Sequence, residues 1–445
     1  RLAPRLLEAA RATGAPDTAF ARFVDFFAAL GSGVQVQSLF LAQPRLFELV
    51  LRIMAFAPRF ARALARSPAA LDALLDPDFF APLGPWPGLS AAVADAGGFE
   101  DSMGAARRLH REAAFRIGVQ VLGGVATAPD AGRAFADLAD GLIAGLSRAA
   151  LDEVERAAGR FPGEAAVVAM GKCGSREMTA RSDLDLMTLY RPNLPDWTSR
   201  AKGWSAEAFH ARFTQRLVAA LSAPTAEGGL YEVDLRLRPS GAKGPVAVSL
   251  AAFQSYYREE ADSWEFLAMT RGRVIWATSP AFATAAAAAL ESVLRRPRDH
   301  AAVAADVREM RALMARERPA AGFWDMKLAD GGLVDIEFCA QYLQLIHASE
   351  GGPLCQNTAE ALAALDLAGL APRPSLEALR AAWDLQQGLS QLLRVALEDD
   401  ADPAVEPVAL RALLARAGGA RRFVDLKAAL ARARRDAHRA FRSLI

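Results

Sequence analysis

The chain has 445 residues, of which 52% are hydrophobic and 8% aromatic, and its formal net charge is +1. This length allows two or three domains with sizeable cores, and a composition dominated by Ala and Leu favours a mostly helical protein with one modest sheet. Acidic and basic residues are interspersed along the chain. The charge pattern therefore excludes the electrostatic footprint of a protein that binds nucleic acid.

The cysteines and the hydrophobic runs bear on the cellular compartment. Cys173, Cys339 and Cys355 are too few and too scattered for a disulfide framework or a zinc site, which indicates a reducing compartment. The most hydrophobic early stretch, residues 38–60, is interrupted by Pro, Arg and Glu, so we expect no membrane-spanning segment. We therefore expect a cytoplasmic protein. Its first residue is Arg rather than Met, which suggests a piece of a longer chain.

Residues 1–100 are expected to form short helices separated by prolines. Apolar residues recur at helical spacing in residues 17–30 and 44–55, and residues 67–75 begin with a plausible N-cap. The region contains no cluster of titratable groups, so we interpret it as a packing or partner-binding module rather than a catalytic site. Prolines and glycines between residues 82 and 88 indicate a boundary.

Residues 101–161 again show apolar residues at helical spacing. They contain a short basic cluster formed by Arg107, Arg108, His110 and Arg111. Such a cluster is typical of a solvated helix face, and contact with phosphate or with an acidic partner is the alternative.

The first acidic pair follows a buried strand. Residues 165–170 are an apolar run of strand length, and a second apolar run after a short loop is interrupted by Asp183 and Asp185. Strand side chains alternate between faces, so both carboxylates should project from one face. Because adjacent carboxylates repel and are costly to bury, this pair predicts a bound hard cation such as Mg²⁺ or Mn²⁺. A solvated strand edge is the alternative.

A second polar strand is expected within residues 228–241. Its residues alternate between an apolar face and a face that carries Asp234, Arg236 and Arg238. Asp234 could join Asp183 and Asp185 around a metal ion, and the two arginines could donate hydrogen bonds to phosphate. The alternative is an internal ladder of salt bridges. Farther along the chain Arg258, Arg271 and Arg273 receive no assignment.

Residues 294–445 are predicted to be helical almost throughout. Within them a Gly-Gly pair precedes a helix that is apolar nearly all round and is therefore expected to be buried. Asp335 and Glu337 lie in its first turn, where carboxylates also favour the helix dipole. Either they cap this helix or they face a catalytic cleft and pair with its arginines.

These parts together suit nucleotidyl transfer. Near Gly174 and Ser175 backbone N–H groups can approach phosphate oxygens, because no bulky side chain intervenes. One or two Mg²⁺ ions on the three aspartates would bridge those phosphates, and Asp234 could help to activate an attacking hydroxyl. The loop has neither the Walker A form nor the Rossmann form. Lys172 and Ser182 are further candidates for nucleotide binding, and Glu177 is a candidate for the cleft.

The sequence resembles the glutamine synthetase adenylyltransferase family, within the nucleotidyltransferase superfamily that includes DNA polymerase β. Three motifs carry the resemblance: Met170-Gly-Lys-Cys-Gly-Ser-Arg-Glu-Met with Ser182-Asp-Leu-Asp-Leu, Tyr231-Glu-Val-Asp-Leu-Arg-Leu-Arg-Pro-Ser-Gly, and Gly331-Gly-Leu-Val-Asp-Ile-Glu-Phe. The sequence departs from the family pattern at Ser175, where the family usually has Gly, and at Cys173, where it usually has Leu.

The resemblance implies an α+β, predominantly helical fold. A polymerase-β-like nucleotidyltransferase domain with a small mixed sheet (101–293) would lie between a helical regulatory region (1–100) and a C-terminal helical bundle (294–445). Family members are tandem duplications, and the sequence of residues 176–185 resembles that of their C-terminal, adenylylating half. Such a half moves AMP from ATP to a tyrosyl hydroxyl of glutamine synthetase.

The resemblance also implies the partners. The regulatory region would respond to glutamine and to the PII signalling protein. The alternatives to adenylylation are phosphorolytic removal of AMP by the same fold, or a catalytically silent half that binds PII.

Overall fold

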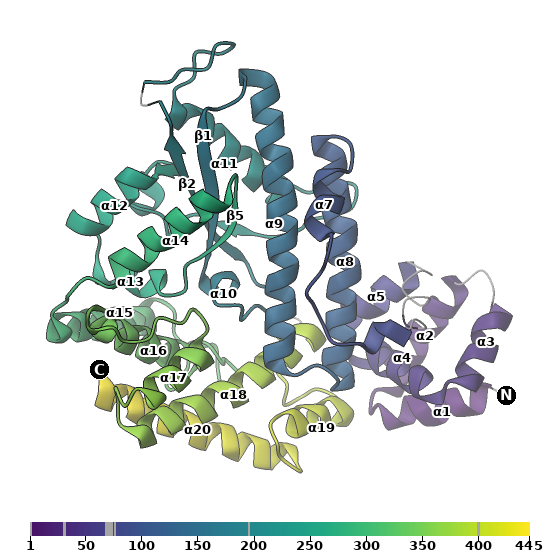
Figure 1. Ribbon diagram of the computed structural model, residues 1–445. Coiled ribbons are helices and arrows are strands. Elements are labelled where there is room, and N and C mark those ends of the chain that lie inside the picture. The colour runs from purple at the N-terminus through teal and green to yellow at the C-terminus, as the bar shows by residue number, and fades with distance from the viewer. Residues whose placement is uncertain (1, 30–32, 67–73, 75–76, 195, 398–400) are drawn as a thin grey trace.

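The computed structural model describes residues 2–29, 33–66, 74, 77–194, 196–397 and 401–445 (Figure 1). Most of these residues lie in helices, and the strands form a single five-stranded mixed sheet. The prediction of a predominantly helical α+β protein with a small mixed sheet is therefore confirmed. No helix in the described part of the chain is both long and apolar enough to cross a membrane.

The N-terminal helices form a separate bundle at one side of the molecule (Figure 1). Phenylalanines of α2, α3 and α4, among them Phe23, Phe40 and Phe47, form its core. Two of the predicted helices correspond to α2 and α4, whereas most of the third, residues 67–75, lies outside the described residues. The bundle comprises α1 (Leu2–Ala12), α2 (Pro16–Ala29), α3 (Gly33–Ala42), α4 (Pro44–Phe56) and α5 (Pro58–Arg66), and η1 (Pro77–Phe80) follows it.

Two long helices, α8 (Phe99–Gly123) and α9 (Ala128–Ala158), run side by side through the middle of the molecule (Figure 1). A capping box between Thr127 and Asp130 fixes the start of α9, because each side chain accepts a hydrogen bond from the other residue's backbone N–H. The short helix α7 (Leu89–Ala94) packs on both. In α8 the buried Arg107 donates to the backbone carbonyls of Ala220, Ala223 and Gly228. Arg107 is therefore not on a solvated helix face, as predicted, but holds residues 220–228.

The sheet has the order β3-β2-β1-β5, with β4 also paired to β2. Strands β2 and β5 run antiparallel to β1, whereas β3 and β4 run parallel to β2. The predicted apolar run 165–170 is the buried part of β1. Four helices pack against the sheet: α9, α11 (Ala206–Ser222), α12 (Leu250–Glu259) and α14 (Pro280–Leu294). The strands are β1 (Gly163–Met170), β2 (Leu184–Pro192), β3 (Val233–Asp234), β4 (Ala247–Ser249) and β5 (Arg273–Ala277).

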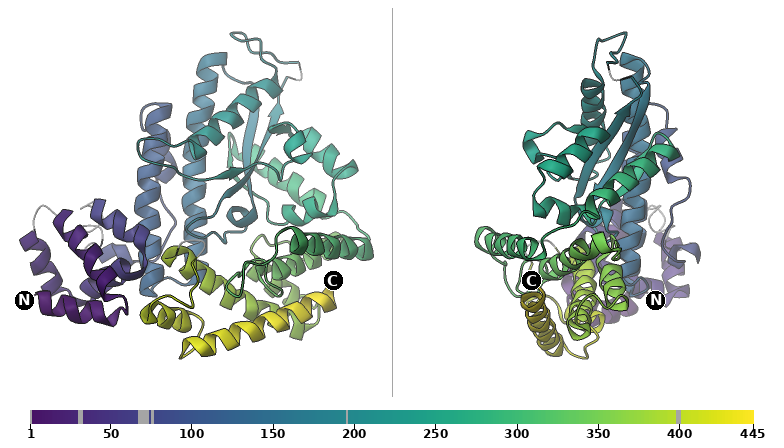
Figure 2. Two further views of the ribbon diagram at one scale, coloured as in Figure 1. Left: turned by 180° about the vertical axis from the view of Figure 1, so that it is seen from behind. Right: turned by 60° about the vertical axis from the view of Figure 1, so that its left-hand side comes forward.

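The helices between and after the strands complete this part of the molecule. They are α10 (Gly171–Gly174), α11 (Ala206–Ser222), η2 (Gly241–Lys243), α12 (Leu250–Glu259), α13 (Ser263–Met269) and α14 (Pro280–Leu294). The one-turn helix α10 lies at the end of β1 that faces the C-terminal helices (Figures 1 and 2).

The C-terminal helices form a layer below the sheet and the two long helices (Figure 2). Helix α18 contacts α8 and α9, and α15 and α16 contact α13, so this layer packs on both the central helices and α13. It comprises α15 (His300–Glu317), α16 (Leu333–His347), η3 (Ala348–Glu350), α17 (Thr358–Leu367), α18 (Arg373–Ala396), α19 (Val408–Ala417) and α20 (Phe423–Leu444).

Candidate functional site

The three predicted aspartates come together at one end of the sheet. Asp185 lies opposite Met170, the last residue of β1, and opposite Asp234, the last residue of β3. Asp183 lies just before β2 rather than within it, and its side chain is exposed. The sheet topology therefore collects three carboxylates where β1 and β3 end and β2 begins.

Asp185 is the most perturbed of the three carboxylates. Partial burial, together with the negative charges of Asp183 and Asp234, raises its pKa to about 6 against the opposing effect of Arg271 and Lys327. A carboxylate that is desolvated beside two like charges holds negative charge that the protein does not neutralise. This is the electrostatic signature of a group that awaits a cation.

Gly171 makes room for Asp185. The residue has a φ of +53°, and a Cβ atom there would lie 2.0 Å from the Oδ2 atom of Asp185. Both facts require glycine, because other residues rarely adopt this backbone conformation and the carboxylate occupies the side-chain space. The reason for Gly174 is different, since a Cβ there would lie 2.0 Å from the carbonyl oxygen of Arg271. Gly174 thus allows close packing of α10 against the turn before β5.

The predicted long polar strand around Asp234 is wrong. Strand β3 contains only Val233 and Asp234, and the chain then turns. Within the turn the guanidinium group of Arg236 grips the carboxylate of Asp234, to which its Nε atom donates at 2.8 and 3.0 Å, and this lowers the pKa of Asp234. Arg238 is buried and donates to the carbonyl oxygens of Leu235, Gly244 and Pro245. Arg238 therefore stabilises the turn instead of facing the aspartates.

The donor set suits a hard divalent ion only in part. Carboxylate oxygens are the ligands that Mg²⁺ prefers. As the side chains of the described residues stand, no three His, Cys, Asp or Glu groups are close enough together to hold a metal ion. Asp234 is directed at Arg236, so it would have to exchange that partner for a cation. Asp183 and Asp185 have the chemistry for such a site, and Asp234 is the conditional third ligand.

Positive charges lie beside the carboxylates. Arg271 contacts Glu337 at 3.2 Å, and both side chains are largely buried. Burial lowers the pKa of Lys172, as do the positive charges of Lys327, Arg394 and Arg271, whereas Glu337 opposes this effect. Glu337 thus faces the site, as one of the two alternatives predicted. Sequence reasoning left Arg271 unassigned and did not single out Lys327.

The loop between α10 and β2, residues 175–182, is held from the C-terminal layer. The two carboxylate oxygens of Glu177 accept hydrogen bonds from the backbone N–H (2.6 Å) and the hydroxyl (3.1 Å) of Thr358. Asn357 donates to the carbonyl of Ser175, and Gln391 donates to the carbonyl of Met178 at 2.6 Å. Complete burial raises the pKa of Glu177 to about 7. Glu177 therefore joins the loop to α17.

Ser182 ends the same loop. Its hydroxyl accepts a hydrogen bond from the backbone N–H of Thr179 at 2.8 Å, which closes a turn immediately before Asp183. In this arrangement Ser182 positions the start of β2.

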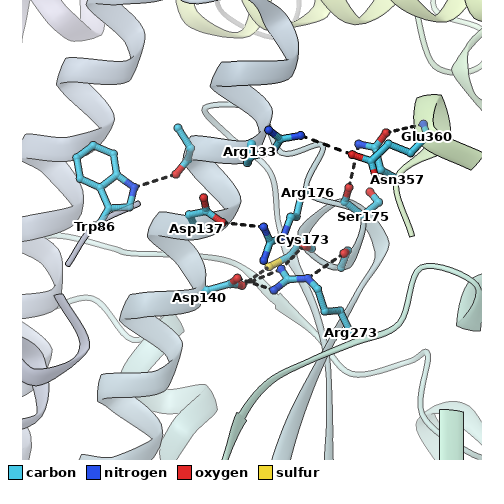
Figure 3. A network of polar contacts seen from close by, with 12 residues as sticks. Trp86, Arg133, Asp137, Asp140, Cys173, Ser175, Arg176, Arg273, Asn357 and Glu360 are labelled. Atoms are coloured by element: carbon cyan, nitrogen blue, oxygen red, sulfur yellow. Dashed lines mark hydrogen bonds and ion pairs between the residues drawn. The ribbon is translucent and has the colours of Figure 1, made fainter. Parts of the chain in front are cut away.

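Helix α9 holds α10 from the other side (Figure 3). Arg273 donates two hydrogen bonds to Asp140 of α9, at 2.6 and 2.9 Å, and two more to the carbonyl oxygens of Cys173 and Gly174. Arg133 of the same helix reaches Glu360 of α17 at 3.6 Å. The loop and α10 are thus fixed between the central helices and the C-terminal layer.

Comparison with known families identifies the relationship. Residues 47–311 match the family model of glutamate-ammonia ligase adenylyltransferase, which is more than half of the chain. The chain belongs to this family. Residues 302–445 match the model described as PII-uridylyltransferase. The boundary between the two matches lies within α15.

Individual members of the adenylyltransferase family align along almost the whole chain. A bifunctional glutamine synthetase adenylyltransferase/adenylyl-removing enzyme of Caulobacter vibrioides is 62% identical over 450 residues, which cover 100% of this chain and 45% of that protein. Enzymes of the same description from Rhizobium meliloti and Bradyrhizobium diazoefficiens are 42% and 39% identical, and the alignments cover 46% and 45% of their lengths. The chain thus spans about half the length of the curated relatives that it matches.

The remaining residue predicted for the candidate site, Asp335, has its hydrogen-bond partners elsewhere. It is 1% exposed and accepts hydrogen bonds from Arg311, from the backbone N–H of Gly331 at 2.7 Å, and from His438 at 3.2 Å. These contacts lie entirely within the C-terminal layer. Of the two predicted roles, Asp335 takes the structural one: it ties α15, α16 and α20 together.

Proposed function

We propose that this chain transfers AMP from ATP to a tyrosyl hydroxyl of glutamine synthetase. The observation that carries the proposal is the convergence of Asp183, Asp185 and Asp234 at the end of the sheet, beside the half-buried cations Lys172 and Arg271. Clustered carboxylates next to positive charges suit a reaction in which phosphate groups and metal ions meet. Membership of the adenylyltransferase family supports the choice of substrate.

Asp183 and Asp185 would hold Mg²⁺ or Mn²⁺, with Asp234 as a third ligand. Such an ion supplies charge neutralisation for the phosphate oxygens at which the reaction occurs. Binding it would lower the pKa of Asp185 and remove the repulsion among the three carboxylates.

The residues of the chain would orient and deprotonate the acceptor. In the reaction the tyrosyl oxygen bonds to the α-phosphorus, the bond between this phosphorus and the bridging oxygen breaks, and pyrophosphate leaves. Asp234 is the candidate acceptor for the hydroxyl proton, because its carboxylate lies beside Asp185 at the end of β3. Ser175 and Ser182 would position the phosphate-binding turn and β2.

The fold and the place of this chain in a longer protein are part of the proposal. A mixed sheet whose strands present carboxylates at one end supports a polymerase-β-like nucleotidyltransferase core. The coverage of the relatives supports one half of a longer protein, and the sequence of residues 176–185 favours the adenylylating C-terminal half. The N-terminal helices would then belong to the regulatory region, with glutamine and PII as effectors.

The decisive experiment supplies labelled ATP, Mg²⁺ and unmodified glutamine synthetase to this chain. We expect label on glutamine synthetase with wild type and none with Asp185→Asn. Absence of label with wild type would contradict the proposal. If adenylylated glutamine synthetase and inorganic phosphate then yield ADP, the chain is the adenylyl-removing half.

A further inference from the structure

A single guanidinium group, that of Arg273 at the start of β5, joins α9 to α10 (Figure 3). It donates two hydrogen bonds to the Asp140 carboxylate and two to the carbonyl oxygens of Cys173 and Gly174, at 2.9 and 3.1 Å. The side chains of Arg273 and Asp140 are only 17% and 19% exposed. Because a guanidinium group is planar, four simultaneous hydrogen bonds fix the orientation of α10 as well as its distance from α9.

Helix α10 depends on contacts from outside. It has four residues, Gly171–Gly174, and two of them are glycine. One helical turn fixes more backbone dihedral angles than its own hydrogen bonds can offset, and glycine raises that entropic cost. The hydrogen bonds from Arg273 reach the last two carbonyl groups of this turn. Arg273 therefore supplies support that the turn itself lacks.

Both ends of α10 touch the candidate site. At Gly171, the first residue, the Asp185 carboxylate fills the space that a side chain would occupy. At Gly174, the last residue, the carbonyl oxygen of Arg271 fills the corresponding space. The turn is thus in close contact with a carboxylate at one end and with the segment before β5 at the other. A shift of α10 would be passed directly to Asp185.

The anchor for Arg273 is one face of the long helix α9. Asp137 and Asp140 are three residues apart and therefore lie on the same side of this helix. Asp137 forms an ion pair with Arg176 at 3.5 Å, in the loop that follows α10. Gly132 lets that loop approach closely, since a Cβ atom there would lie 3.3 Å from the carbonyl oxygen of Arg176. The face that carries Asp140 thus holds both the turn and the loop after it.

We propose that Arg273 and Asp140 are positioning residues of the candidate site, which hold α10 in the place that Asp185 requires. This inference rests on the proposed AMP transfer, for which the carboxylates must keep their relative positions. Both residues act through α10 and not on the substrate. Their loss should therefore lower kcat for AMP transfer, because a displaced carboxylate weakens transition-state stabilisation, and should leave KM for ATP nearly unchanged.

The first experiment follows α10 directly and needs no substrate. Cys173 in α10 and Cys339 in α16 are both fully buried, so each thiol reacts with iodoacetamide only when its surroundings open. In Arg273→Lys, which keeps the charge and loses the planar fork, we expect labelling of Cys173 to accelerate at least about tenfold and that of Cys339 to stay the same. Mass spectrometry of the labelled peptides separates the two thiols.

A second variant covers the case in which Arg273→Lys fails to fold. Asp140→Asn should act in the same direction with a smaller effect, because Arg273 can still donate to the carbonyl groups of α10. Equal acceleration at Cys173 and Cys339 would show a general loss of stability and overturn the proposal. Unchanged labelling of Cys173 in both variants would also overturn it.

The second experiment measures AMP transfer. We expect kcat of Arg273→Lys to fall at least about tenfold, with KM for ATP within about twofold of wild type. Arg191→Lys is the matched control, because Arg191 binds Glu164 through a similar fork at the opposite end of β1 and β2. This control should change neither kcat nor labelling of Cys173.

The two readouts separate the positioning role from the proposed function. If Cys173 opens selectively while wild type transfers no AMP, the hold on α10 stands and the proposed function fails. If wild type transfers AMP and both variants keep kcat, only the positioning role fails. Equal losses of kcat in Arg273→Lys and Arg191→Lys would likewise overturn the positioning role.

Discussion

Two acidic pairs with the same spacing have opposite fates in this protein. Asp183 and Asp185 lie on either side of Leu184, the first residue of β2, and remain close together there, where their charges repel. Asp335 and Glu337 lie in the first turns of helix α16, where residues two positions apart point about 200° from one another. Asp335 accordingly faces the C-terminal layer, and Glu337 faces Arg271 and the catalytic side.

The difference shows how to separate structural from functional charge. Asp335 has a hydrogen-bond donor on each oxygen and stays buried, which is the usual state of a charge that belongs to the architecture. Asp185 is desolvated among like charges, and the ion-pair partner in its neighbourhood, Arg271, is engaged by Glu337. Such repulsion in the folded protein is what we expect of a site that a ligand completes.

Asp185→Asn should separate the effect on activity from the effect on stability most clearly. We expect AMP transfer to fall at least about a thousandfold, because removal of a metal-binding carboxylate costs several kcal/mol of transition-state stabilisation. The free energy of unfolding should stay the same or rise, since one of three repelling charges is lost. Initial rates with labelled ATP and urea unfolding measure the two effects. Asp152→Asn, on the exposed face of α9, should change neither.

Asp335→Asn should show the reverse pattern in stability. Removing one partner of a buried ion pair leaves Arg311 with only the exposed carboxylate of Asp330, so the free energy of unfolding should fall by about 3 kcal/mol. Urea unfolding measures this loss. The control is Asp436→Asn, whose exposed pair with Arg439 is worth less than about 1 kcal/mol. Equal stability of the two variants would contradict the structural role of Asp335.

Gly171→Ala tests the close approach to Asp185. The positive φ alone should cost about 1–2 kcal/mol of folding free energy, and the new Cβ must also displace the carboxylate, so AMP transfer should fall at least about tenfold. Gly203→Ala is a matched control, because Gly203 has a φ of +64° but no atom within 4 Å of its Cβ position. Equal activities in the two variants would show that Asp185 tolerates displacement.

Glu177 links the two kinds of site, and it should affect the pH dependence of stability. Its pKa is raised to about 7 from a usual value of 4.5, so the unfolded chain releases the proton at lower pH than the folded chain. The stabilising contribution is therefore fully present below about pH 4.5 and is lost as the pH rises to about 7, at no more than about 1.4 kcal/mol for each pH unit.

The test is Glu177→Gln. We expect this variant to keep the contacts with Thr358 and to lose this part of the pH dependence of urea unfolding. A wild-type stability that rises with pH over this range, attributable to Glu177, would contradict the assignment.

How far the sequence predicts this structure depends on the range of the interactions. The helix over residues 44–55 and the strand over residues 165–170 were predictable, because local periodicity and composition determine them. The alternation of polar and apolar residues at 233–238 led to the wrong prediction of a strand. Arg236 and Arg238 instead have hydrogen-bond acceptors within the turn.

The acidic residues of the candidate site were predictable from the sequence, whereas its basic residues were not. The spacing of Asp183 and Asp185 carries its own electrostatic cost and is visible in the sequence. Nothing local distinguishes Arg271, which faces Glu337, from Arg273, which binds Asp140 and the backbone of α10. Likewise, Lys327 acquires its neighbours only when the C-terminal layer packs against α10.

The contacts that hold the loop 175–182 also limit which parts of two related chains can be joined in a chimaera. The catalytic loop and its holders Asn357, Thr358 and Gln391 lie on opposite sides of the boundary between the two matched family models. A chimaera joined at α15 would therefore inherit the aspartates from one parent and the residues that position them from the other. We therefore expect the loop 175–182 and the residues of the C-terminal layer that hold it to change together in evolution.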